Sequence, residues 1–152
     1  MDETFGSWEI FYPSLPLHGS YGFNKRLLAG EFAPLPLHLR RKGSFRVIDI
    51  EGRENIPVLL DCTCPVVSGE PNDPPPPLGI DLRLPGVRGV CLNRHNECVN
   101  ALFLDWSARR VGLKELWTLK WEPHFDTRGP WTRAGGVKPG DWPKWMRSFK
   151  DY

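Results

Sequence analysis

The chain has 152 residues and a formal net charge of +2, and hydrophobic residues make up 40% of it. These values fit one domain with one core, so we expect a single domain over residues 1–152. The weak charge and the scattered basic residues give no indication of nucleic acid or an anionic membrane as a partner. No apolar run reaches the ~20 residues that cross a bilayer, and the acidic start MDETFGSWEIF does not look like a signal peptide.

Prolines and glycines interrupt the first half of the chain and predict short strands between loops. The sequence holds 16 prolines and 15 glycines, so a large part of it is expected in turns. The segment GSYGFN (19–24) predicts a turn that enters a strand, and SFRVIDI (44–50) predicts an extended segment. The segment NIPVLLDC (55–62) predicts a strand buried on both faces because it is continuously apolar. Pro57 is expected near the start of that strand or at an unpaired position.

A proline-rich segment at residues 65–86 predicts a long surface loop. Within it, Pro74 to Pro77 are expected to form a short polyproline II rod. Such a rod could be a ligand for an aromatic groove, or it could be a stiff connection between two strands. The segment lacks a repeated P-x-x-P pattern with flanking basic residues, which favours the stiff connection.

The second half of the chain predicts an antiparallel β-meander followed by a short helix. Residues 88–111 are expected to form three strands, of which the first covers VRGVCLN (87–93), with reversals near 94–97 and 105–108. Apolar residues then recur at helical spacing, which predicts a helix within 113–122.

A tryptophan-rich tail forms the end of the chain at residues 122–152. Asp141 is expected to cap a last helical turn there. The predicted fold class is therefore α+β: a small antiparallel β-meander with one short helix after it, in a loop-rich chain.

Four cysteines could form two disulfides in an oxidising compartment or remain reduced thiols. Cys62 ends one predicted core strand and Cys91 lies in another, so a disulfide between them requires Cα atoms within about 7 Å. A zinc site could draw on Cys62, Cys64, Cys91, Cys98 and His95. C-x-C followed by C-x6-C is not the usual pair of zinc knuckles, however, so we assign no metal site. The acidic residues Asp61, Asp73, Asp81 and Asp105 also lack the D-x-D-x-D spacing of a calcium loop.

The sequence contains no nucleophile elbow, phosphate-binding loop, H-E-x-x-H or dinucleotide-binding motif. An enzymatic interpretation would use His95 as base, Asp105 as its orienting group and Cys91 or Cys98 as nucleophile. No segment supplies an oxyanion hole for such a set. The alternative is structural: His95 caps a first turn, and Asp105 accepts backbone N–H groups at a second. We therefore predict no enzyme, no catalytic residue and no cofactor.

His95 and Asp105 lie within RHNECVNALFLDWSARRV, which resembles the H-x9-D-G segment at the C-terminal end of one large class of prepilin-like proteins. These are the type II secretion protein G-like pseudopilins. Trp106 stands where that family has glycine, so the turn is expected not to rely on a positive φ at this position. The resemblance extends over most of the chain, through GSYGFN, NIPVLLDC, VGLKELWTLKW and FDTRGPWTRAGGVKPGDWPKWMRSFKDY.

The resemblance implies a structural subunit of a type II secretion pseudopilus or a type IV pilus-like filament, with a role in protein export. The chain would be its pilin-like globular head without the apolar N-terminal helix, on the periplasmic side of the inner membrane. Its partners would be other pilin-like subunits, and only the missing helix would contact the membrane. Without that helix, one sheet face is expected to leave an exposed apolar patch near residues 56–60 or 99–104, and the isolated chain is expected to self-associate.

A module that binds carbohydrate or peptide through exposed tryptophans is the alternative function. Exposed, coplanar rings would favour this module, and buried rings would favour the filament head. The tryptophans in question are at positions 106, 117, 121, 131, 142 and 145.

Overall fold

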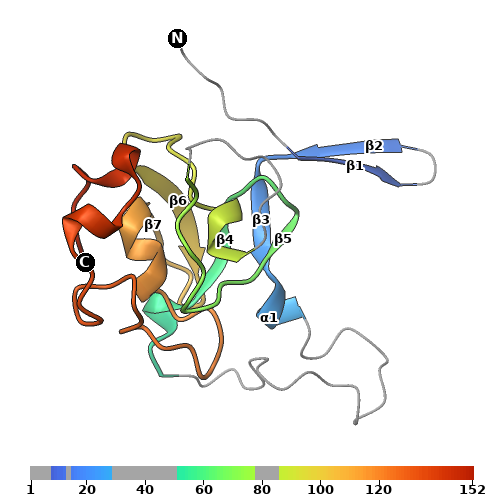
Figure 1. The fold of residues 1–152 in the computed structure, drawn as a ribbon. Coiled ribbons are helices and arrows are strands. Elements are labelled where there is room, and N and C mark those ends of the chain that lie inside the picture. Colours follow the sequence, from blue (N-terminus) through green and yellow to red (C-terminus); the bar gives the residue numbers. More distant parts are fainter. Residues whose placement is uncertain (1–7, 13–14, 29–50, 78–85) are drawn as a thin grey trace.

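A mixed five-stranded sheet with strand order β5-β3-β4-β6-β7 is the main element of the computed structural model (Figure 1). The structure describes residues 8–12, 15–28, 51–77 and 86–152. The strands of this sheet are β3 (Tyr21–Asn24), β4 (Pro57–Asp61), β5 (Val66–Val67), β6 (Cys98–Phe103) and β7 (Ala108–Gly112). Neighbouring strands are antiparallel except β3 and β5, which are parallel. The fold is thus α+β and loop-rich, but its sheet is mixed and not the purely antiparallel meander that we expected.

A separate antiparallel hairpin precedes the sheet and leads into β3. It consists of β1 (Trp8–Tyr12) and β2 (Leu15–Gly19). Figure 1 shows this hairpin extending to one side of the five-stranded sheet. The predicted turn into a strand at residues 19–24 is confirmed, because β3 begins at Tyr21.

Strands β4, β6 and β7 form the centre of the sheet, and their sequence explains their register. In β6, Val99, Ala101 and Phe103 are buried while the residues between them are half-buried, as the alternation of a strand requires. β4 begins at Pro57, as predicted, and its register with β6 shifts between Pro57 and Leu59. A proline fits this place because it cannot donate a hydrogen bond to the neighbouring strand.

The helices are short and mostly of the 3₁₀ type. They are α1 (Lys25–Leu28), η2 (Arg53–Asn55), η3 (Gly86–Gly89), η4 (Leu113–Thr118), η5 (Pro139–Asp141) and η6 (Lys144–Met146). The helix predicted within 113–122 is therefore present as η4, but it is a 3₁₀ helix and ends at Thr118. Asp141 ends η5 and its carboxylate accepts the N–H of Lys138 at 2.8 Å, so its predicted role as cap of the last turn was wrong. No helix in the described part of the chain has the length and apolar character needed to cross a membrane.

The strand predicted over 87–93 is wrong, because η3 and a turn occupy this segment. The N–H of Cys91 donates to the carbonyl of Val87 at 3.0 Å, which is a turn contact. The apolar residues of the segment are buried in the core, and a short apolar run does not distinguish a buried turn from a buried strand. The reversal near 94–97 consequently joins a turn to β6, whereas the reversal near 105–108 joins β6 to β7 as predicted. The segment 44–50 lies outside the described residues.

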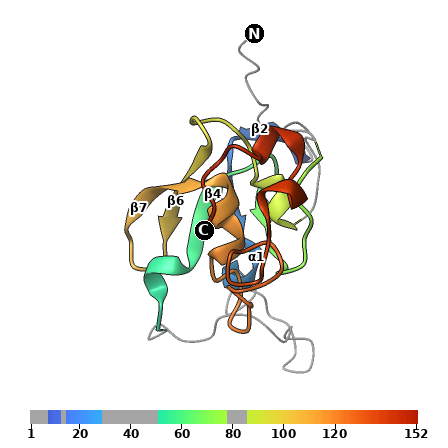
Figure 2. The ribbon, with the colours of Figure 1, turned by 60° about the vertical axis from the view of Figure 1, so that its left-hand side comes forward.

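The hydrophobic core lies between one face of the sheet and the C-terminal half of the chain (Figure 2). Trp117, Trp121 and Trp142 are almost fully buried in it. The rings of Trp117 and Trp142 meet edge to face, with centroids 5.4 Å apart, and Trp131 lies at the same distance from Trp142. Such contacts stabilise the core beyond the burial of area alone. The tail therefore forms one wall of the core.

The proline-rich loop is attached to these tryptophans, and Pro75 and Pro76 are buried. The indole N–H of Trp145 donates to the carbonyl of Pro76 at 3.0 Å, and that of Trp117 donates to the carbonyl of Asp73 at 2.7 Å. The prediction of a surface loop was thus wrong for these prolines. The chain uses its own aromatic side chains to hold the polyproline segment, in the manner of an aromatic groove.

Candidate functional site

The structure does not bring His95 and Asp105 together. His95 lies before β6, and its Nε2 is 3.1 Å from Oδ2 of Asp61. Asp105 lies in the exposed turn at the other end of β6, where it bonds to Ser107. The enzymatic interpretation therefore loses the contact between base and orienting group that it required.

Asp61, at the end of β4, is the polar centre that the sequence reasoning did not identify. Its side chain is buried, and it accepts the backbone N–H of Asn100 at 2.7 Å. Arg94 approaches at 3.5 Å and also donates to the carbonyl of Ser20 at 2.8 Å. A buried carboxylate with these partners ties β4 to the start of β6 and to the loop before β3. The only signal in the sequence was an aspartate at the end of an apolar strand.

No disulfide joins the four cysteines in this structure. Burial raises the pKa of Cys62 to about 11 and raises that of Cys91 further. Since the thiolate is the reactive form, neither residue has the character of a nucleophile. The disulfide between Cys62 and Cys91 stays a prediction. Within the described ranges, no group of three or more His, Cys, Asp or Glu side chains could hold a metal ion.

The turn between β6 and β7 is fixed by Asp105, whose Oδ1 accepts both the N–H and the hydroxyl of Ser107, at 2.9 and 2.6 Å. The predicted role of Asp105 as an acceptor for backbone N–H groups is confirmed. Trp106 has φ = 68°, so the expectation that this turn avoids a positive φ was wrong. Three-residue hairpin loops place their last residue in the left-handed region, and this loop takes that form with a tryptophan.

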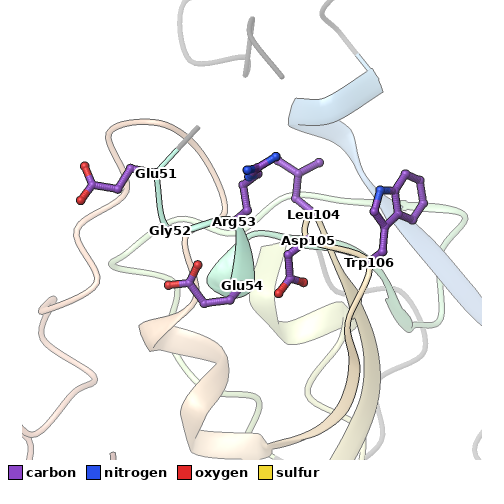
Figure 3. Close-up of a pocket in the computed structure, with 7 residues that line it drawn as sticks. All are labelled: Glu51, Gly52, Arg53, Glu54, Leu104, Asp105 and Trp106. Atoms are coloured by element: carbon purple, nitrogen blue, oxygen red, sulfur yellow. The ribbon is translucent and has the colours of Figure 1, made fainter. Parts of the chain in front are cut away.

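A pocket of about 650 Å³ lies between this turn and η2 (Figure 3). It is lined by Glu51, Gly52, Arg53, Glu54, Leu104, Asp105 and Trp106. The N–H of Leu104 donates to the carbonyl of Ile56 at 3.0 Å and so ties the two walls together. The side chain of Trp106 is 80% exposed. Figure 3 shows its ring at one end of the pocket and Glu51 at the other.

The sheet face opposite the core carries exposed apolar side chains. Tyr21 and Phe23 of β3 are each 45% exposed, and Val66 of β5 is 44% exposed. Leu59 and Leu102 are paired partners on β4 and β6, and both are half-buried. A groove of about 450 Å³ runs over this face and is lined in part by Tyr21, Leu59 and Leu102. We call these five residues the open face.

The open face corrects two predictions. The predicted apolar patch near 56–60 or 99–104 includes Leu59 and Leu102, but the most exposed side chains come from β3 and β5. The strand at 55–62 was expected to be buried on both faces, yet its Leu59 side is covered only in part by the described residues. A continuous apolar run suggests that both faces of a strand are buried, but the burial of each face depends on segments that are distant in the sequence.

The described tryptophans do not form an exposed coplanar set. Trp117, Trp121 and Trp142 are buried, Trp131 and Trp145 are half-buried, and Trp106 alone among these six is strongly exposed. Comparison of the chain with known protein families, with curated proteins and with solved structures found no match. The arguments on function therefore depend on the sequence motif, the open face and the pocket at Trp106.

Proposed function

We propose that this chain is the pilin-like globular head of a filament subunit, of the type found in type II secretion pseudopili and type IV pilus-like filaments, with a role in protein export. The open face is the observation that carries the proposal. Pilin-like heads pack a sheet on an apolar N-terminal helix, and here the sheet offers aromatic and aliphatic side chains on the side away from the core. The subunit would work at the cell envelope, with other pilin-like subunits as its partners.

The energetic argument concerns the half-exposed side chains of the open face. Tyr21, Phe23 and Val66 are each almost half exposed. Burial of the remaining area under a helix would contribute about 1 kcal/mol for each of them. That sum, about 3 kcal/mol, is a sizeable fraction of the stability of an ordinary domain. An apolar helix is therefore a physically suitable occupant.

The turn after β6 supports the resemblance independently of the open face. Asp105 fixes the turn, and the next residue adopts φ = 68°, which is the backbone that the glycine of an H-x9-D-G segment would adopt without strain. His95, at the other end of the motif, contacts Asp61. This contact gives the histidine a structural role and has no bearing on export.

A fusion protein provides the first test. A pilin-type apolar helix placed before the chain and purified in detergent is expected to raise the melting temperature above that of the isolated chain. Phe23→Glu should remove this gain, because a carboxylate cannot be buried under an apolar helix without cost. Arg128→Ser, an exposed position away from the open face, serves as the matched control and should keep the gain. An equal gain in the Phe23 variant would contradict the proposal.

Deletion of the gene in the organism that encodes the chain provides the second test. We expect the amount of exported protein to fall, and to recover when the wild-type gene or the Arg128→Ser variant is restored. The Phe23→Glu variant should not restore export, although its circular dichroism spectrum should remain that of a folded chain. Unchanged export after deletion, with the chain recovered away from the cell envelope, would reject the filament function.

The alternative function, a module that binds ligands through several tryptophans, has less support. Five of the six tryptophans considered are buried or half-buried and serve the core or the proline-rich loop. Trp106 differs from these five tryptophans because it is strongly exposed and lines a pocket.

A further inference from the structure

Apolar side chains form one continuous row across the sheet, on the side away from the core. Directly paired residues of neighbouring strands lie on the same face, and the pairings give this row one residue from each of the five strands. In strand order, the row consists of Val66, Phe23, Leu59, Leu102 and Ala108. We call these residues the apolar row. Its two leucines are half-buried and its other members are exposed.

A second row on the same face is polar, and it lies two residues further along the strands. Tyr21 of β3 is the partner of Asp61 in β4. Asn100 of β6 donates its N–H to Asp61 at 2.7 Å and is the partner of Arg110 in β7. Along a strand, this face therefore changes from apolar to polar between one row and the next. A path across the strands along the apolar row meets apolar side chains only.

Arg110 carries a charge of the polar row that has no opposite charge beside it among the described residues. The carboxylate of Asp61 is compensated by Arg94 at 3.5 Å. Arg110 is exposed, and it donates to the backbone carbonyls of His95 and Asn96 without forming an ion pair within the described ranges. These bonds hold its guanidinium beside the groove of about 450 Å³ that it helps to line. A carboxylate at the β7 end of the apolar row would complement this charge.

We propose that the occupant of the open face is a helix that crosses the strands along the apolar row and carries a carboxylate over Arg110. This inference rests on the proposed function and specifies how the helix lies. The four gaps between the five strands, at about 4.8 Å each, span about 19 Å. About 13 residues of an α-helix cover that length. The helix would place apolar side chains at helical spacing on the row and an aspartate or glutamate on its flank at β7.

A helix aligned with the strands is the main competing arrangement. An α-helix with its side chains is about 10–12 Å wide, so it would cover only two or three strands. Val66 and Ala108 lie in the two edge strands of the sheet, so at least one of them would stay uncovered. The aligned helix would also lie over Asp61 and Asn100, where it has polar groups beneath it. The crossing helix avoids both disadvantages.

The helix fusion, made with a glutamate in the first and in the last turn of its helix, supplies the test of direction. A gadolinium-binding peptide tag is placed before the helix in one protein and after it in another. Nuclear magnetic resonance then measures which amide signals of the ¹⁵N-labelled chain each tag broadens. We expect one tag to broaden the signals of β5 and the other those of β7, because the two ends of a crossing helix lie over opposite edges of the sheet.

Charge reversal tests the contact with Arg110. Each glutamate of the helix is replaced by lysine in turn, and urea denaturation measures the unfolding equilibrium. At the end over β7, lysine should shift this equilibrium toward the unfolded state by about twofold to fivefold, as for a partly exposed ion pair. In Arg110→Glu, the preference should reverse at that end and stay unchanged at the other. Arg128→Glu changes the same charge at an exposed position away from the open face, so it should have no such effect.

The results distinguish this arrangement from the proposed function. If the fusion raises the melting temperature but both tags broaden the same strands, the crossing arrangement is wrong and the proposed function stands. The same conclusion follows if Arg110→Glu behaves like Arg128→Glu. If the fusion gives no gain, both proposals fail together. Sedimentation of the isolated chain provides a further check: a stable dimer that Phe23→Glu disrupts, with no gain from the fusion, would assign the apolar row to a second copy of the chain.

Discussion

Replacement of Trp106 by glycine is expected to give a more stable protein than replacement by alanine. Both changes remove the indole, which is 80% exposed, so the loss of its few contacts is the same in the two variants. They differ in the backbone. At φ = 68°, a Cβ atom strains the left-handed conformation by about 1–2 kcal/mol, and glycine avoids this strain. Glycine also loses more freedom on folding, which offsets about 0.4–1 kcal/mol of the gain.

The net difference is about 1 kcal/mol in favour of Trp106→Gly over Trp106→Ala. For a domain of this length, that corresponds to about 2–4 °C in melting temperature. Urea denaturation and differential scanning calorimetry would both measure it. Ala108→Gly is the matched control: Ala108 lies in β7 without a positive φ, so glycine should destabilise there by about 0.5–1 kcal/mol. Equal stability of the two Trp106 variants would refute the strain argument.

The remaining predictions concern the core and the turn. Asp151→Asn should destabilise the chain by about 2–3 kcal/mol in urea denaturation. The side chain of Lys114 is fully buried, and this change removes the carboxylate that lies 2.7 Å from its ammonium group. Lys114→Met should destabilise the chain less, since it removes the buried charge itself. Asp105 has a lowered pKa in the folded state, so its contribution to stability is present above its unfolded value of 3.8 and is lost as the pH falls below it; Ser107→Ala should make acid unfolding less dependent on this group. Alkylation followed by mass spectrometry should modify Cys91 only after denaturation, because burial raises its pKa, and rapid labelling of the native protein would contradict its burial.

Local patterns predicted the elements whose contacts are near in sequence. The β6–β7 hairpin follows from alternation in the residues of β6 and from an aspartate and a serine that fix the turn. The start of β4 follows from Pro57, which is tolerated at the beginning of a strand. These features depend on side chains within a few positions, so the sequence alone was sufficient to predict them.

Contacts between distant segments could not be predicted in this way. Asp61 and His95 meet because β4 pairs with β6. The spacing of His95 from Asp105 pointed instead to a residue at the opposite end of β6. The segment at 87–93 is apolar because Val87 and its neighbours enter the core, and burial in a turn leaves the same pattern as burial in a strand. The positive φ of Trp106 was missed because a bulky residue rarely adopts it.

The two sides of the sheet differ in how completely they are covered, and the hydrogen bonds of three tryptophans on the core side show why. The indole groups of Trp117, Trp121 and Trp145 donate to backbone carbonyls within the chain, at 2.7, 2.8 and 3.0 Å. All three indole N–H groups bond within the fold, and the rings of Trp117 and Trp121 are almost fully buried, so changes there should act through stability. Tyr21 and Phe23 on the open face are still almost half exposed, so changes there should act through association while the fold persists. This asymmetry, with one side of the sheet covered by the C-terminal segments and apolar side chains half-exposed on the other, is the feature on which the proposed role in an assembly depends.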